Sequence, residues 1–540
     1  MIQHVPQESE GTGNAGRASA PIDLREKKTR KGLLQVRRIR PGIPCADGFN
    51  GFLRALPGDR LLNAHIFCCG CWQRLILFWG RSRRGYAAGD WAGAIWRSPP
   101  GKRGVSLHEA LLRRPCSCIR RLAGNRAREV QFTRFLRNKK VGIAEMASHA
   151  AARTAERVAG REVIVVQDTS ELFLGGRRAK ANGYGPVGKG GGVRGLLLHA
   201  ALAIDAGNDA LLGLVDAQVW NRDKGKVTAR RSRATGDKES QRWISAAAKA
   251  GKALSAARSI TVISDRESDI YEHFVRRPAN VEFIVRASWD RQIKLTSGES
   301  ARLFAFGARL PKVDRFSVTI PAAPGRKQRT AELVLRFSPV TLCRPHPSPG
   351  PGLPDTIGLT MVDVREVSAD HGGKPIHWRL LTTHVLTSPD QARRIVDLYR
   401  KRWVIEEFFR TLKTAGFDIE EADIGEPEVM IKFVAATAVA AVTIMQLVRS
   451  RDGMTQESIA DALEPDDRPV LEALSAPLEG ATVKQKNPYP KGTLAFAAWV
   501  IARLGGWTAY YGKPGPKIMR LGLEVFRRIK YGTTLKLQNV

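Results

Sequence analysis

The chain has 540 residues, which is long enough for about two to four domains with a sizeable core. Lysine and arginine total 87 against 52 acidic residues, which gives a formal net charge of +35. This excess favours a polyanion such as nucleic acid as partner, although a merely soluble basic protein is the alternative. Seven cysteines are too few for a disulfide scaffold and indicate a reducing cytoplasm.

The N-terminal part has a composition of its own. Residues 1–105 show little periodicity, and about half of the positive excess lies within residues 1–150. We assign no fold to residues 1–105, a basic extension that is either disordered or begins at a start site placed too far upstream. Residues 106–160 turn helical, with Phe132 and Phe135 at helix spacing.

A small cysteine cluster in this extension raises the question of zinc. His65, Cys68, Cys69 and Cys71 lie close together in the sequence. A structural zinc site needs a second pair of ligands at workable spacing, and the sequence offers none. The cluster therefore does not favour a metal site.

Residues 161–286 alternate between short apolar runs and one alanine-rich stretch. β-branched runs at 163–166 and 259–263 predict buried strands, each followed closely by an acid. Further strands are predicted at 196–204, 211–219 and 281–286, and a helix at 238–258. This order predicts an α/β fold with a mixed sheet flanked by helices.

The remainder of the chain divides into three segments. Residues 287–387 lose the helical pattern and predict a β-rich insertion subdomain. Residues 388–450 return to the core with one long helix, capped by Ser388 and ended by Gly416, and a second, buried helix. The apolar run of that second helix is short of the ~20 residues that span a bilayer. Residues 451–540 predict a helical C-terminal region.

Two carboxylates, Asp168 and Asp265, follow the buried runs. Like charges at neighbouring strand ends repel unless a cation lies between them, and Mg²⁺ prefers such oxygen ligands. Two ions about 3.5–4 Å apart could cleave a phosphodiester. On their own the two acids are weak evidence, because an aspartate after a strand often caps a turn.

The long helix adds a third acid. At 100° per residue, one stripe of this helix lies beside an apolar face and contains Tyr399, Arg402, Glu406, Arg410 and Lys413. One carboxylate among several cations suits a helix that lines a phosphate-binding cleft. The alternative is a solvated face of ion pairs spaced four residues apart.

Together these residues resemble a known family. The spacing of Tyr399, Arg402, Glu406 and Lys413 matches the tyrosine–arginine–glutamate–lysine signature of bacterial insertion-sequence transposases, family number four, which includes the enzyme of transposon five. The segments around Asp168 and Asp265 resemble the first and second acid motifs of this family. The segment 238–243 is similar to a recurrent family segment, and the matches extend from about residue 122 to about residue 532.

The resemblance implies an RNase H-like catalytic core that performs cut-and-paste transposition in a dimeric complex with double-stranded DNA, both transposon ends and target. Asp168, Asp265 and Glu406 would be the catalytic residues and would hold two Mg²⁺ ions, or Mn²⁺. The DNA-binding residues it implies, with Arg410 added from the helix stripe, are Tyr399, Arg402, Lys413, Trp378, Arg286 and Arg410.

Trp378 would stack on a base flipped from a DNA hairpin, and the alternative for this residue is a tryptophan buried in the β insertion. Residues 106–160 would form a helical DNA-binding region, and residues 451–540 would dimerise. The expected location is the bacterial cytoplasm, at the nucleoid and not in a membrane. Two competing hypotheses are a stand-alone metal-dependent nuclease on the same core and a non-catalytic DNA-binding derivative of a transposase.

Overall fold

The computed structural model describes residues 99–175, 183–188, 192–222, 236, 238–295, 297–320, 327–346, 352–367, 375–414, 416–454 and 457–538, and four strands nearer the N-terminus. The chain divides into two compact units, Met1–Arg84 and Gly85–Val540. In the first unit, β1 (Leu34–Gln35), β2 (Phe52–Arg54), β3 (Leu61–Cys68) and β4 (Cys71–Phe78) pair in sequence order. The side chains of the cysteine cluster lie outside the described residues.

Between residues 161 and 286 the second unit contains the five strands and the alanine-rich helix that the sequence predicts, in that order. Its helices are α1 (Pro99–Arg113), α2 (Ile119–Ala123), α3 (Arg126–Arg137), α4 (Ile143–Ala155), α6 (Gln241–Ala253), α7 (Tyr271–Val275), α8 (Leu303–Arg309), α9 (Pro389–Arg400), α10 (Val404–Lys413), α11 (Pro427–Ser450), α12 (Asp467–Leu478), α13 (Leu494–Leu504) and α14 (Pro516–Gln538). Its strands are β5 (Glu162–Leu174), β6 (Gly185–Val187), β7 (Val193–Asp205), β8 (Leu211–Trp220), β9 (Ser259–Ser264), β10 (Glu282–Arg286), β11 (Gln292–Lys294), β12 (Ser300–Arg302), β13 (Asp314–Ile320), β14 (Arg329–Cys343), β15 (Thr356–Glu366) and β16 (His377–Thr382).

Twelve of the described strands form one sheet in the order β12-β11-β14-β15-β16-β10-β9-β5-β7-β6, with β13 on β14 and β8 on β7. Among the described strands, only the pairs β5–β9 and β9–β10 are parallel. The prediction of a mixed sheet flanked by helices is confirmed, although most pairs are antiparallel. The strands of segment 287–387 continue this sheet, because β16 pairs with β10. The domain boundaries themselves stay predictions.

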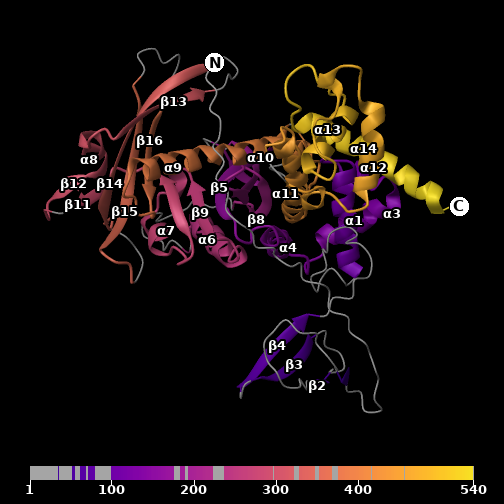
Figure 1. Ribbon diagram of the computed structural model, residues 1–540, viewed down its shortest axis with the longest axis horizontal. Helices are drawn as coiled ribbons and strands as arrows, with labels where there is room; N and C mark the ends of the chain where they lie inside the picture. The colour runs from indigo at the N-terminus through magenta and orange to yellow at the C-terminus, as the bar shows by residue number, and fades with distance from the viewer. Residues whose placement is uncertain are drawn as a thin grey trace, which may run out of the picture. The chain divides into compact units, whose positions relative to one another are not determined.

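Helices cover both faces of the central strands (Figure 1). Side chains alternate between the two faces of a strand, and β5 shows this clearly. Val163 and Val165 belong to a core shared with α6 and α7, whereas Ile164 and Val166 belong to a core shared with α9, α10 and α11. Consecutive residues of β5 therefore face different helical layers.

The second, buried helix predicted within residues 388–450 is α11. By length and composition it is apolar enough to cross a membrane, yet 83% of its most apolar window is buried inside the structure. It packs against α10, α4, β8 and α13. Burial on all sides accounts for its apolar composition, as in the core helix of a globular protein.

Candidate functional site: three carboxylates around one guanidinium

The first two acids stand beside each other on the sheet. Asp265 directly follows β9, as predicted. Asp168, however, does not end its strand, because β7 continues to pair with β5 as far as Leu174. On the other side of β5, pairing with β9 stops at Val166. Asp168 therefore lies just beyond the last parallel pair, where the end of β9 brings Asp265 next to it.

The third acid comes from the helical layer. Ser388 caps α9 as predicted, since its hydroxyl accepts a hydrogen bond from the N–H of Gln391. The prediction of one continuous helix as far as Gly416 is wrong. A 3-10 turn at Lys401–Trp403 separates α9 from α10, and a short 3-10 stretch within a helix often marks a functional or strained position. Glu406 stands in the first turn of α10.

Arg402, in this turn, joins all three acids. Its Nη1 lies 2.9 Å from Asp168 Oδ2 and 3.4 Å from Glu406 Oε1, and its Nη2 lies 3.8 Å from Asp265 Oδ2. Only 6% of the Arg402 side chain is exposed. We call Asp168, Asp265 and Glu406 the three-carboxylate cluster. Residues more than 230 positions apart in the chain thus meet around a single guanidinium.

Burial and charge together set the electrostatics of the cluster. Burial raises the pKa of Asp168 to about 7, with further increases from Glu406 and Asp265, against the opposing effects of Arg402 and the N–H of Thr169. Burial alone would lower the pKa of Arg402, but Tyr399 and the three carboxylates raise it above its ordinary value. The cluster therefore retains a positive charge at its centre.

The carboxylate oxygens of the three-carboxylate cluster are suitable ligands for divalent cations, but in this arrangement they surround the guanidinium of Arg402. Asp265 Oδ1 is buried and accepts no hydrogen bond. An oxygen in this state is available as a ligand for a metal ion. Within the described ranges, no group of three or more His, Cys, Asp or Glu side chains is arranged to hold a metal ion. Arg402 stands between the carboxylates, so a cation could bind there only after this guanidinium moves.

Two more predicted residues line the same side of the cluster. The Nη1 of Arg286 lies 4.0 Å from Asp265 Oδ1, and its Nη2 donates to the carbonyl oxygen of His377 at 3.1 Å. Tyr399 is buried, and this burial raises its pKa, with a smaller contribution from the charge of Asp265. The structure therefore brings Arg286 and Tyr399 to the cluster.

Trp378 is half-buried in β16 and meets Tyr399 edge to face, with ring centroids 5.8 Å apart. It packs against the core shared with α9 and α10, but it is not fully covered. Its placement beside Tyr399 puts an aromatic face near the cluster, and its role in stacking on a base stays a prediction.

The last two predicted residues lie apart from the acids. Lys413 pairs with Glu420 at 3.6 Å and stands over the ring of Phe173. Arg410 is 59% exposed and pairs with Glu407 at 3.6 Å. Neither contacts the three-carboxylate cluster in the part of the chain that is described. Both lie farther along α10 than Glu406.

Sequence reasoning missed a polar network behind Asp168. The N–H of Thr169 donates to Asp168 Oδ1 at 2.8 Å, and the hydroxyl of Thr169 lies 2.9 Å from Nδ1 of His199. His199 is fully buried, and burial holds its pKa well below the ordinary value. The signal was available, because His199 is the one polar residue in an otherwise apolar strand at 196–204.

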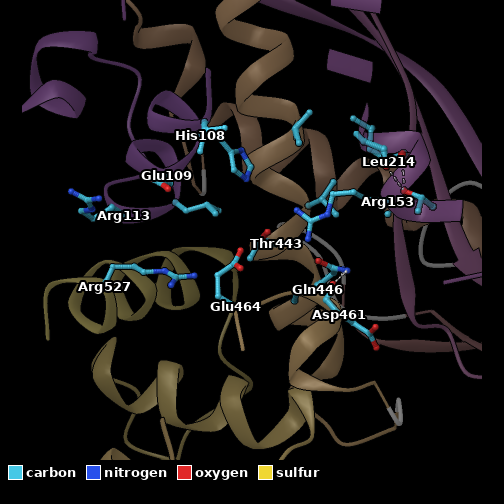
Figure 2. Close-up of a pocket in the computed structure, with 18 of the residues that line it drawn as sticks. His108, Glu109, Arg113, Arg153, Leu214, Thr443, Gln446, Asp461, Glu464 and Arg527 are labelled. Atoms are coloured by element: carbon cyan, nitrogen blue, oxygen red, sulfur yellow. Dashed lines mark hydrogen bonds between the residues drawn. The ribbon is translucent and has the colours of Figure 1, made fainter. Parts of the chain in front are cut away.

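A cavity of about 360 Å³ lies elsewhere in the second unit, between α1, α4, α11 and α14. Figure 2 shows Arg153 and Arg527 in its wall together with Glu109, Asp461 and Gln446. None of the predicted site residues lines it. Because acidic and basic groups mix there, the lining favours no ligand charge, and the three-carboxylate cluster remains the stronger candidate.

Comparison with known families agrees with this choice. Residues 280–441 match the family model described as the transposase DDE domain. The matched segment contains Glu406 and Arg402 together with all the other predicted DNA-contacting residues, whereas Asp168 and Asp265 precede it. The match supports a transposase of the DDE type, a class that acts on DNA and generally uses divalent metal ions.

Proposed function

We propose that the chain is a cut-and-paste DNA transposase of insertion-sequence family four. The convergence of Asp168, Asp265 and Glu406 around one guanidinium carries this proposal, because like charges that meet from distant parts of the chain repel one another unless a cation joins them. The family match at residues 280–441 and the formal net charge of +35 support it. An RNase H-like core is the fold that the proposal implies.

The three carboxylates would hold two Mg²⁺ ions, or Mn²⁺, which when bound stabilise the charge on attacking and leaving oxygens of an in-line displacement. Arg402 would leave the three-carboxylate cluster and place its guanidinium on a DNA phosphate, which Arg groups bind in bidentate fashion. Tyr399, Arg286, Lys413 and Arg410 would hold neighbouring phosphates. The residues of the chain would thus orient one phosphodiester at a time.

The same arrangement can serve each proposed step, because each is a phosphoryl transfer. Water attacks the phosphodiester at the element end, and the bond to the 3′ oxygen breaks to release a 3′-hydroxyl. That hydroxyl attacks the opposite strand, which forms a hairpin and releases the flanking DNA. A second water opens the hairpin, and the freed 3′-hydroxyl then attacks target DNA. A homodimer would hold the two ends, in the bacterial cytoplasm at the nucleoid.

The decisive experiment incubates the purified full-length chain with Mg²⁺, a target plasmid and DNA fragments bearing the inverted repeats that flank the coding sequence. A transposase gives nicked ends, hairpins and joined products, and omission of the divalent cation removes all three. A stand-alone nuclease would give cleavage without hairpins or joining. A non-catalytic derivative would bind the ends and cut nothing. Either of the last two outcomes would overturn the proposal.

Trp378→Ala is expected to separate the steps. If the indole stacks on a flipped base, its loss costs about 1–3 kcal/mol at the hairpin stages, which corresponds to roughly a 5- to 150-fold slower hairpin formation and opening. First-strand nicking should keep its wild-type rate, because it needs no flipped base. Gel analysis of nicked, hairpin and resolved products measures this. Trp289→Ala, at an exposed tryptophan, is the control. Equal slowing of all steps would contradict the stacking role.

A further inference from the structure

Arg242 is held rigidly on the face of the sheet opposite the cluster. It stands at the second position of α6, and only 12% of its side chain is exposed. Its guanidinium carbon lies 5.3 Å from the ring centroid of Trp243 and 5.7 Å from that of Trp220. Cation–π contacts with two tryptophans restrict the guanidinium, and such contacts strengthen when they are desolvated.

All three nitrogens of this guanidinium have acceptors. Nε donates to the hydroxyl of Thr169 at 2.8 Å, and Nη2 donates to Oε2 of Glu267 at 2.7 Å. Nη1 donates to the carbonyl oxygen of Glu239, just before α6, at 2.8 Å. Thr169 follows Asp168, and Glu267 lies two residues after Asp265. One side chain therefore ties together the two segments that carry the first two acids.

The alternation along β5 explains why this tie lies behind the site. Asp168 lies an even number of residues from Ile164 and Val166, so its side chain is on their face of the strand, toward α10. Thr169 lies an even number of residues from Val163, so its side chain is on the opposite face, toward α6. The N–H of Thr169 also donates to Asp168 Oδ1. A displacement of Thr169 thus moves the carboxylate of Asp168 directly.

We propose that Arg242 is a positioning residue that sets the separation of Asp168 and Asp265 from the α6 side and thereby sets the affinity of the site for divalent cations. This inference rests on the proposed function. Arg402 joins the same acids from the α10 side, but its guanidinium has to leave when cations enter. Arg242 touches no ligand oxygen of the three-carboxylate cluster, so its tie persists in either state.

The test measures Mn²⁺ binding to the full-length chain by electron paramagnetic resonance, without DNA. Arg242→Gln is expected to raise the Kd for Mn²⁺ by about 10- to 100-fold, which is typical of residues that orient metal ligands. The Kd for Mn²⁺ of Arg242→Lys should lie between those of the wild type and Arg242→Gln, because one ammonium reaches fewer of these acceptors. The Mn²⁺ concentration for half-maximal DNA cleavage should shift in the same order.

Arg258→Gln is the matched control. Arg258 precedes β9 and pairs with Glu162 at the start of β5 at 3.0 Å, so it ties the same two strands at their other end. Its loss should leave the Kd for Mn²⁺ unchanged. Should Arg242→Gln fail to fold, Thr169→Val removes the same hydrogen bond with little change of shape and should weaken Mn²⁺ binding severalfold.

Wild-type Mn²⁺ affinity in a folded Arg242→Gln chain, with or without a lower melting temperature, would show that Arg242 is only structural. Asp265→Ala separates this failure from failure of the proposed function. If Asp265→Ala abolishes Mn²⁺ binding and Arg242→Gln does not alter it, only the proposed positioning role of Arg242 is excluded. If Asp265→Ala binds Mn²⁺ as the wild type does, the proposed metal site itself is excluded.

Discussion

Glu406→Gln is expected to abolish cleavage of DNA that carries the element ends. The substitution keeps the size of the side chain but removes one of three charges from the three-carboxylate cluster. A site that works through bound cations loses charge stabilisation in the transition state when it loses a carboxylate ligand. We expect a decrease in the nicking rate of at least about a thousandfold, or about 4 kcal/mol. Asp265→Ala should have the same effect.

Glu407→Gln is the matched control for this experiment. Glu407 is the next residue of α10 and pairs with Arg410, outside the three-carboxylate cluster. Its loss should change the nicking rate by less than about fivefold, because an ion pair with an exposed arginine contributes little. DNA binding by gel shift should remain close to wild type for both variants. Nicking by Glu406→Gln at the rate of Glu407→Gln would exclude Glu406 from the chemistry.

Arg402→Ala is expected to destabilise the metal-free chain and to increase its response to metal. Without the guanidinium, the three carboxylates repel one another, and Asp168, whose side chain is 17% exposed, loses its ion-pair partner. Removal of one partner from a buried ion pair costs about 3–5 kcal/mol. In EDTA the free energy of unfolding should fall by about this amount. Millimolar Mn²⁺ should restore more stability to the variant than it adds to the wild type, because added cations need not displace Arg402.

Urea denaturation at pH 8 in EDTA and in Mn²⁺ measures this difference. Burial raises the pKa of Asp168 to about 7, so this carboxyl favours the folded state most when protonated and loses that contribution as the pH rises from about 4 to 7. At pH 8 the carboxylate is mostly ionised. Arg410→Ala, at an exposed arginine of the following helix α10, should change stability by about 1 kcal/mol or less. An equal Mn²⁺ effect in both variants would contradict the displacement of Arg402.

Local signals in the sequence predicted the parts of the site that depend on neighbouring residues. The β-branched run before Asp265 predicted β9, and Ser388 with Pro389 predicted the start of α9. These features depend on burial and capping within a few residues, which sequence patterns record well. The helical spacing also identified Glu406, although an ideal helix could not predict the 3-10 turn before it.

Features that depend on distant pairing were not predictable in the same way. The continuation of β5 past Asp168 requires β7 as a partner, and the local sequence around Asp168 contains no information on that pairing. The sequence does not reveal that the guanidinium of Arg402 reaches Asp168 across the fold. Arg402 was therefore predicted only to contact a DNA phosphate. The role of Arg242 was missed for the same reason, although the segment that contains it was recognised.

The pairing of β10 has a consequence for efforts to shorten this chain. β10 has β9 on one side and β16 on the other, and β16 belongs to the segment between the second and third acids. Deleting that segment would expose the backbone amides and carbonyls of β10 along an open edge, which is prone to join another molecule. It would also remove His377, whose carbonyl oxygen accepts a hydrogen bond from Arg286. A minimal version of this protein should therefore be trimmed at its ends rather than at its middle.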